Sequence, residues 1–256
     1  MRVVRLSTDP ELLLLRDFVS EDEARVLIEA ADAHFKRSVT VCSDPQGCAI
    51  EDRTSSSAAI PASEITEAIQ TRGKLLANTP VAEEIQVVRY GPGQEFKPHL
   101  DAFDVSGGGM QALAQYEGRQ REATVLIYLS GPEAGGETVF PELGLRIKPV
   151  PRTALFWRNV RHDGSIDPRT LHGGAPVQRG VKYAANLWLR GAQDAIYTYA
   201  RSENVTPPEP PPKVESAAII ALGVGVGAAV GGPLGAVVGG VAGWTVDAIR
   251  RRLITP

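Results

Sequence analysis

Apolar residues recur at helical spacing in two stretches near the N-terminus. Ser20-Glu-Asp-Glu23 forms a capping-box pattern that begins a helix, with Ser20 at the N-cap and Glu23 at N3. The apolar stripe of this first helix consists of Val26, Leu27, Ala30, Ala31 and Phe35. A second helix is expected over residues 62–77, with its stripe at Ile65, Ala68, Ile69 and Leu76.

From residue 84 the pattern changes to short β-rich runs that are separated by glycine and proline. Regularly spaced short strands with turn signals between them are typical of a sandwich or barrel. We therefore expect an α+β fold, in which N-terminal helices pack outside a double-stranded β-helix (jelly-roll) core. The predicted strands cover residues 85–90, 123–129, 145–147, 153–157 and 183–189.

Two segments within this region have the composition of long loops. Residues 42–57 are rich in Ser, Asp, Gly and Pro, and residues 102–120 contain three consecutive glycines. A long loop beside a site is usually functional or disordered. Both interpretations stay open here: a disordered surface insert, or a lid that covers a bound substrate and excludes water.

The overall composition is that of a soluble globular protein. Of 256 residues, 43% are hydrophobic and 22% are charged, and the net charge of −3 gives no reason to expect a nucleic-acid partner. Cys42 and Cys48 are the only two cysteines, so neither a four-cysteine zinc site nor a disulfide framework is expected. The N-terminus lacks the long apolar core of a secretory signal, which favours a cytoplasmic location.

The C-terminal part has a different pattern. A proline-rich linker at residues 206–213 is typical of a stiff polyproline spacer, and no charged residue follows between Glu215 and Asp247. Glycines at every fourth position place small residues along one helical face, which is typical of closely packed membrane helices. These glycines are Gly223, Gly227, Gly231, Gly235, Gly239 and Gly243.

Three interpretations compete for this tail. In the first, it is a membrane anchor or a helical hairpin bent at Gly232-Pro233, with basic residues 250–252 among lipid headgroups. In the second, it is a self-associating glycine zipper. In the third, it is an apolar tail docked on the protein's own surface. Because glycine costs about 1 kcal/mol relative to alanine in a helix, lipid or a partner helix would have to stabilise it, so we favour membrane or oligomer contact. The expected domains are residues 1–200, the linker 201–215 and the tail 216–256.

Candidate chemistry lies in the strand-rich region. His99 and Asp101 alternate, so an extended chain projects both to one side, and His172 completes two imidazoles and one carboxylate. This is the ligand set by which non-haem iron(II) oxygenases hold their metal on one face. The other two histidines, His34 and His162, are expected not to be ligands. Lys182 lies in a strand-like run, where it is either buried with an anionic partner or solvent-facing.

The flanks of these residues resemble the prolyl 4-hydroxylase family of iron(II)- and 2-oxoglutarate-dependent dioxygenases. The resemblance covers roughly residues 10–192 in the family's order. An early Arg-Thr-Ser signature at residues 53–57 takes part in it. The other matching blocks are residues 86–101, 121–130, 135–141, 153–159, 170–177 and 180–189.

The resemblance implies a set of cofactors and a role for each matching residue. His99, Asp101 and His172 would hold Fe(II), with O2 as a co-substrate and ascorbate as the reductant. The 2-oxoglutarate co-substrate would be bound by Lys182 at its distal carboxylate, with hydroxyl groups from Tyr90 and Thr138. The peptide substrate would face Arg121 and Trp188, although a Trp188 that fills the core is an equally open interpretation, and Trp157 is expected in the core.

The implied activity is hydroxylation of a peptidyl or protein residue, with proline favoured and with release of succinate and CO2. Phe96 stands where the family often has tyrosine, and the missing hydroxyl argues against classical collagen-type hydroxylation. Two alternatives remain. One is hydroxylation of a free amino acid or small metabolite on the same scaffold, and the other is a catalytically silent binding module.

Overall fold

The computed structural model of the protein describes residues 1–38, 52–104 and 109–191. These residues all belong to one compact unit of the chain, Met1–Pro210. Both cysteines, the proline-rich linker and the glycine-rich tail lie outside the described residues, so the domain boundaries and the role of the tail stay predictions. Within the described ranges, no helix is both long enough and apolar enough to cross a membrane.

Both N-terminal helices form where the sequence predicts them. In α1 (Glu21–Asp32) the Ser20 hydroxyl accepts from the backbone N–H of Glu23, whose carboxylate accepts from the N–H of Ser20. The capping box is therefore confirmed. The second helix, α2 (Glu64–Ala77), has an equivalent box between Ser63 and Thr66.

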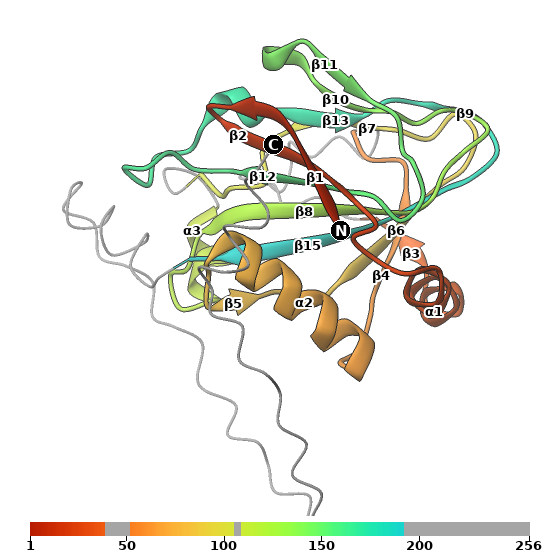
Figure 1. Ribbon diagram of the computed structural model, residues 1–256, viewed down its shortest axis with the longest axis horizontal. Helices are drawn as coiled ribbons and strands as arrows, with labels where there is room; N and C mark the ends of the chain where they lie inside the picture. Colours follow the sequence, from red (N-terminus) through yellow and green to blue (C-terminus); the bar gives the residue numbers. More distant parts are fainter. Residues whose placement is uncertain (39–51, 105–108, 192–256) are drawn as a thin grey trace, which may run out of the picture. The chain divides into compact units, whose positions relative to one another are not determined.

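The core contains two facing sheets, so the predicted β-rich architecture with few helices is confirmed (Figure 1). The larger sheet has nine strands, and its pairs are antiparallel. In spatial order its strands are β1 (Arg2–Thr8), β2 (Glu11–Arg16), β12 (Ala154–Arg158), β8 (Arg121–Ser130), β15 (Lys182–Arg190), β6 (Gln86–Tyr90), β4 (Ser56–Ala59) and β3 (Lys36–Arg37), with β5 (Val81–Ala82) also paired to β15.

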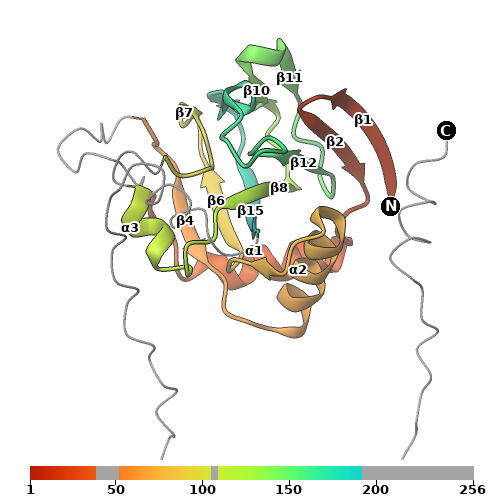
Figure 2. The ribbon, with the colours of Figure 1, turned by 90° about the vertical axis from the view of Figure 1, so that its left-hand side faces the viewer.

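The smaller sheet carries the candidate metal ligands. Its order is β11 (Leu145–Ile147), β10 (Thr138–Phe140), β13 (His172–Gly174) and β7 (Phe96–His99). The described residues also form a two-stranded ribbon of β14 (Val177–Arg179) and β9 (Ala134–Gly135) and two short 3-10 helices, Pro141–Leu143 and Pro168–Thr170. Helices α1 and α2 lie against one face of the larger sheet and the smaller sheet against the other (Figure 2).

Alternation along the central strands explains these three layers. On β8, Val125 and Ile127 face the helices, whereas Thr124 and Tyr128 point between the two sheets. On β15, Ala185, Leu187 and Leu189 likewise pack under the helices. The opposite face of β15 presents Lys182, Ala184, Asn186 and Trp188 to the space between the sheets. The period of two therefore gives each central strand one structural and one site-forming face.

Three features differ from the expectations. The N-terminal hairpin of β1 and β2 was not predicted, because Leu12–Leu15 is buried on both sheet faces and shows no alternation. Phe35 lies beyond the end of α1, although it still packs against the core. The segment predicted as a loop at residues 102–120 contains a short helix, α3 (Gly109–Ala114), and β4 begins at Ser56 inside the other predicted loop.

Candidate active site

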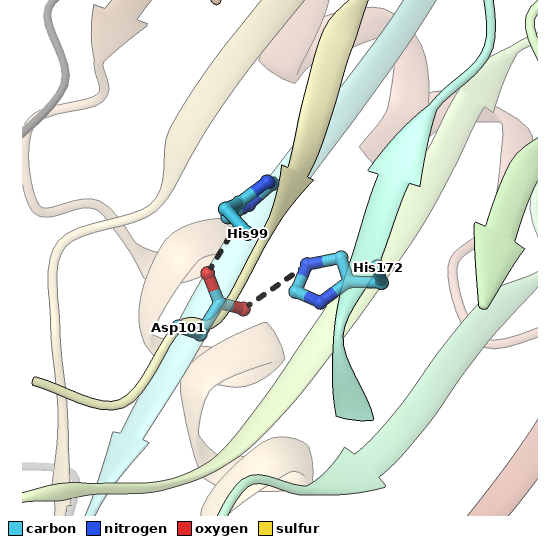
Figure 3. Close-up of side chains that lie close together, drawn as sticks. All are labelled: His99, Asp101 and His172. Atoms are coloured by element: carbon cyan, nitrogen blue, oxygen red, sulfur yellow. Dashed lines mark ion pairs between the residues drawn. The ribbon is translucent and has the colours of Figure 1, made fainter. Parts of the chain in front are cut away.

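His99, Asp101 and His172 converge between the two sheets (Figure 3). His99 and His172 are directly opposite in the β7–β13 ladder, and Asp101 follows β7 by two residues. The Asp101 carboxylate lies 3.7 Å from His99 Nε2 and 3.6 Å from His172 Nε2. One ligand atom from each residue lies within 4.8 Å of the others, a separation that suits a single bound cation.

Close approach of the two strands depends on a glycine. A Cβ on Gly173 would lie 2.8 Å from the carbonyl oxygen of Phe96, so a larger residue would push β13 away from β7. Phe96 also stacks on the His99 ring, with 3.6 Å between centroids. The backbone thus sets the spacing of the two imidazoles.

Each imidazole is held in the tautomer that a metal requires. His99 Nδ1 lies 2.9 Å from the Lys97 carbonyl oxygen, and His172 Nδ1 lies 2.9 Å from the Thr170 carbonyl oxygen. Because a carbonyl only accepts, both Nδ1 atoms carry the proton and both Nε2 atoms offer a lone pair. The Nε2 atoms are the ones that face Asp101.

The protonation states also suit a cation. Burial, and then the neighbouring His172, hold the pKa of His99 well below its usual value, so this imidazole is neutral. Burial alone would raise the pKa of Asp101, but His172, His99 and Arg121 together with a hydrogen bond from Thr124 outweigh it, and the pKa is lowered. A neutral imidazole and an ionised carboxylate are the forms that bind metal.

A buried hydrogen-bonded chain supports Asp101, and the sequence did not reveal it. Thr124 Oγ1 donates to Asp101 Oδ2 at 2.7 Å and accepts from Asn159 Nδ2 at 2.9 Å. Trp157 is in the core, as expected, and its ring meets the His172 ring edge-on at 4.6 Å. These contacts hold Asp101 and His172 in the orientations that a metal ion requires.

Replacing Thr124 by valine is expected to weaken metal binding by about 10- to 100-fold, because Asp101 loses the hydrogen bond that orients it. Titration with Fe(II), or with Co(II) as a spectroscopic probe, measures the affinity. The matched control is Thr153→Val, since the buried Thr153 hydroxyl donates to the Val150 carbonyl oxygen and has no contact with the ligands. Equal affinities in the two variants would contradict a supporting role for Thr124.

Lys182 is a buried cation at the other end of the same pocket. Its ammonium donates to the Gly136 carbonyl oxygen at 2.8 Å, which is its one hydrogen-bond acceptor within the described residues. Burial lowers the pKa of Lys182 to about 8, against an opposing effect from Glu137. The solvent-facing alternative for this lysine is therefore wrong, because its exposed fraction is 3%.

Hydroxyl groups gather around Lys182. Tyr90 is its cross-strand partner, and the Lys182 Nζ atom lies 5.4 Å from the ring centroids of both Tyr90 and Tyr128. Tyr128 donates to Thr138 Oγ1 at 2.7 Å, so the Thr138 hydroxyl proton remains available to an acceptor in the pocket. Tyr128 was not predicted as a site residue.

One pocket joins the two ends, and its residues fit the implied groups. It is lined by Tyr90, Thr138 and Lys182 at one end and by His99, Asp101 and His172 at the other. Two neutral nitrogens and a carboxylate oxygen match iron(II), and an ammonium with one neutral acceptor matches a carboxylate. A dicarboxylate that also chelates the metal would therefore match both ends of this pocket, with one carboxylate at the ammonium and the other at the metal.

A wider groove opens beside His99 and Asp101, with a volume of about 830 Å3. Arg121 and Trp188 both line it, and the Arg121 guanidinium carbon lies 3.7 Å from the centroid of the Trp188 ring system. Trp188 is 9% exposed and so belongs to the groove wall as well as to the core. The structure therefore brings both predicted substrate residues to one surface.

Glu83 holds Arg121 in this wall by a salt bridge, and it was not predicted as a site residue. Its carboxylate accepts from Arg121 Nε at 2.6 Å and Nη2 at 2.9 Å, and it lies 2.7 Å from Arg190 Nη2. Bidentate pairing holds the Arg121 plane against Trp188. Arg121 thus presents a planar face to the groove, while its charge is shared with Glu83. His34 and His162, expected not to be ligands, are exposed and lie outside the metal-ligand cluster.

Comparisons with known proteins agree with this geometry. A family model described as the 2OG-Fe(II) oxygenase superfamily matches residues 85–190, the region that holds the ligands and Lys182. Prolyl 4-hydroxylase 5 of Arabidopsis thaliana is 34% identical over 213 residues, covering 72% of this chain and 69% of the relative. The chain therefore belongs to the prolyl 4-hydroxylase family of 2OG-Fe(II) oxygenases.

Two further relatives show how far the likeness extends. Human prolyl 4-hydroxylase subunit alpha-3 is 36% identical over 187 residues, which is 71% of this chain but 34% of the relative, so the chain spans about a third of that protein's length. The 2OG complex of a viral collagen prolyl hydroxylase from Paramecium Bursaria Chlorella virus-1 superposes with a TM-score of 0.56 at 30% identity. It covers 71% of this chain and 96% of the viral one.

Proposed function

We propose that the protein is an Fe(II)- and 2-oxoglutarate-dependent dioxygenase that hydroxylates prolyl residues in a peptide or protein. The observation that carries this proposal is the joint presence, in one pocket, of the His99–Asp101–His172 set and the buried, under-partnered ammonium of Lys182. A catalytically silent binding module has no use for both features together. Fold alone would not distinguish the two.

The chain's own residues bind and orient the reactants. Lys182, Tyr90 and Thr138 hold the distal carboxylate of 2-oxoglutarate, and the two histidines with Asp101 hold Fe(II), which supplies the oxidative chemistry with O2 when bound. Thr124 and Asn159 keep Asp101 in place. Tight packing around Trp157 and Phe140 excludes water from the back of the site. Ascorbate is the expected reductant that keeps the iron in its ferrous form.

A prolyl substrate is favoured by the relatives and by the shape of the groove. The relatives compared are prolyl 4-hydroxylases, and one is a collagen prolyl hydroxylase. A groove of about 830 Å3 lined by aromatic rings suits an extended peptide better than a single amino acid. Phe96 offers a ring beside His99 but no hydroxyl, so prolyl peptides other than classical collagen sequences are the favoured substrates.

Succinate formation from 2-oxoglutarate tests the proposal and its alternatives together. Purified protein with Fe(II) and ascorbate is assayed alone, with proline-containing peptides, and with free proline. Stimulation by a peptide but not by free proline is the expected result. Stimulation by free proline alone would favour the small-metabolite alternative. No turnover and no binding of iron or 2-oxoglutarate would favour the silent module.

The pKa of Lys182 predicts how 2-oxoglutarate use depends on pH. Only the protonated ammonium attracts the carboxylate, and with a pKa of about 8 half of the Lys182 side chains are neutral at that pH. The KM for 2-oxoglutarate should therefore rise through pH 8 and approach about a tenfold increase per pH unit above it. More than about one pH unit below the pKa, the KM should stay level. The control is Lys182→Arg, which stays charged and should keep a level KM over the same range. A level wild-type profile up to about pH 9.5 would contradict the assignment.

We also propose that the protein acts in the cytoplasm and that its glycine-rich tail mediates membrane association or self-association. The support comes from the sequence: the four-residue glycine repeat from Gly223 to Gly243 and the basic residues that follow it. Removal of residues 216–256 is expected to release the protein from anionic vesicles, or to reduce its mass in solution to that of a monomer. An unchanged protein in both assays would contradict the proposal.

A further inference from the structure

The described chain leaves the barrel at the edge of the substrate groove. On β15, Trp188 faces the groove, and the Arg190 guanidinium carbon lies 3.5 Å from the ring centroid of Tyr116, another groove residue. Gly191 follows directly and donates its N–H to the Gln120 carbonyl oxygen at 3.1 Å. Since a strand rises about 3.3 Å per residue, Gly191 lies about 10 Å along the chain from Trp188. The end of β15 pairs with β5 (Figure 1).

Gly191, the residue at which the described chain leaves β15, is attached to the groove wall. Gln120 holds Phe103 by two hydrogen bonds, accepting from the Phe103 N–H at 2.9 Å and donating to its carbonyl oxygen at 2.8 Å. Gly191 is also anchored at its carbonyl oxygen, which accepts from Arg119 Nη1 at 3.0 Å. The chain after Gly191 therefore starts from a fixed position next to the groove.

The groove is lined by aromatic rings that lie beside the metal ligands His99 and Asp101. Aromatic-lined grooves take proline-rich segments in the polyproline conformation, because that helix is extended, has no internal hydrogen bonds and costs little entropy to bind. The four aromatic residues that line this groove are Phe96, Phe103, Tyr116 and Trp188.

A proline-rich segment follows in the same chain. After Gly191 the first prolines are Pro207 and Pro208, which open the linker at residues 206–213. Fourteen residues lie between Gly191 and Thr206, and the fifteen steps from one to the other would span about 50 Å if extended, or about 20 Å as a random coil. Either length exceeds the short step from Gly191 back to the groove.

We propose that the protein hydroxylates its own chain at Pro207 or Pro208, as an intramolecular reaction in the substrate groove. This reaction requires the proposed function, because it uses the same groove and the same co-substrates. A substrate segment that is tethered to its groove by a short linker has an effective concentration in about the millimolar range, so even weak intrinsic affinity for the segment is sufficient.

The reaction balances with the co-substrates of the proposed function. One atom of dioxygen enters a proline C–H bond as a hydroxyl group, and the other enters succinate as 2-oxoglutarate loses CO2. The prolyl residue and the oxo acid each give up two electrons, which together reduce O2. Each chain offers few such prolines, so the reaction stops after about one turnover per site.

Mass spectrometry of the full-length protein tests the proposal. The protein is incubated with Fe(II), 2-oxoglutarate and ascorbate without added peptide and is then digested with trypsin, which releases residues 202–213 as one fragment because Arg201 and Lys213 flank it. The expected result is the gain of one oxygen atom at Pro207 or Pro208, with a matching burst of succinate. The rate constant should be the same after a roughly hundredfold dilution.

Variants separate this reaction from the general activity. The double variant Pro207→Ala/Pro208→Ala should lose the burst but still form succinate with an added proline peptide, whereas the control Ser202→Ala/Asn204→Ala should keep both. An unmodified fragment in protein that hydroxylates the added peptide would overturn self-hydroxylation and leave the proposed function intact. A rate that rises with protein concentration would also overturn it. No succinate with any peptide would overturn both.

Discussion

Replacing His172 by alanine is expected to abolish 2-oxoglutarate turnover, with a loss of at least about a thousandfold, because a bound metal contributes several kcal/mol to such reactions. His172 supplies one of three ligand atoms that lie within 4.8 Å of one another, and its Nδ1 proton is already committed to the Thr170 carbonyl oxygen. Succinate formation and metal titration measure the two consequences. The rate of succinate formation and the affinity for the metal should fall together.

His172 also packs against Trp157, so the alanine variant is expected to lose some stability. His99→Ala provides a second variant, since the His99 side chain is 24% exposed and its removal disturbs the core less. The matched control is His162→Ala, which removes an exposed imidazole outside the cluster. Turnover in folded His99→Ala protein at the wild-type rate would show that the cluster does not hold the metal.

Replacing Lys182 by methionine is expected to raise the KM for 2-oxoglutarate by about 30-fold or more, since the loss of one partner of a buried charge pair costs about 2–5 kcal/mol. The same change should leave the free energy of unfolding of the protein without ligand unchanged or higher. Lys182 there is a buried cation whose one described acceptor is the Gly136 carbonyl, and an apolar side chain of similar length avoids its desolvation.

Opposite effects on ligand binding and stability distinguish a binding residue from a structural one. Chemical denaturation gives the stability, and KM measurement gives the binding. Lys36→Met, on an exposed residue of β3, serves as the control that should change neither quantity. A variant that unfolds more easily but binds 2-oxoglutarate normally would show that Lys182 acts in the fold and not in the pocket.

Local signals account for the parts of the fold that the sequence predicted. The capping box at Ser20 acts within one turn, and the short apolar runs of β8 and β15 contain β-branched or aromatic residues, which indicate strands although both faces are buried. The run in β2 is also buried on both faces, but it consists of leucines alone, so neither periodicity nor residue type assigns it. The helix α3 lies in a glycine-containing segment and is too short for a periodic pattern.

The residues of the candidate site also fall into those that local signals predict and those that they do not. His99, Asp101, His172 and Lys182 stand in motifs whose spacing is visible in the sequence. Thr124 and Asn159 carry no such signal, because their contacts join residues that are 23 and 35 positions apart. The pairing of Glu83 with Arg121 spans 38 positions and depends on how β5 and β8 meet β15. Such partners follow from the three-dimensional register and not from local composition.

Isotopically labelled dioxygen shows whether this chain couples oxidation of 2-oxoglutarate to hydroxylation of a prolyl residue. The protein is supplied with Fe(II), 2-oxoglutarate, ascorbate, labelled O2 and a proline-containing peptide. We expect one labelled oxygen atom in a hydroxyproline residue of the peptide for each labelled succinate formed, with neither product from the His99→Ala variant. Labelled succinate without any label in the peptide or in the chain's own prolines would contradict prolyl hydroxylation.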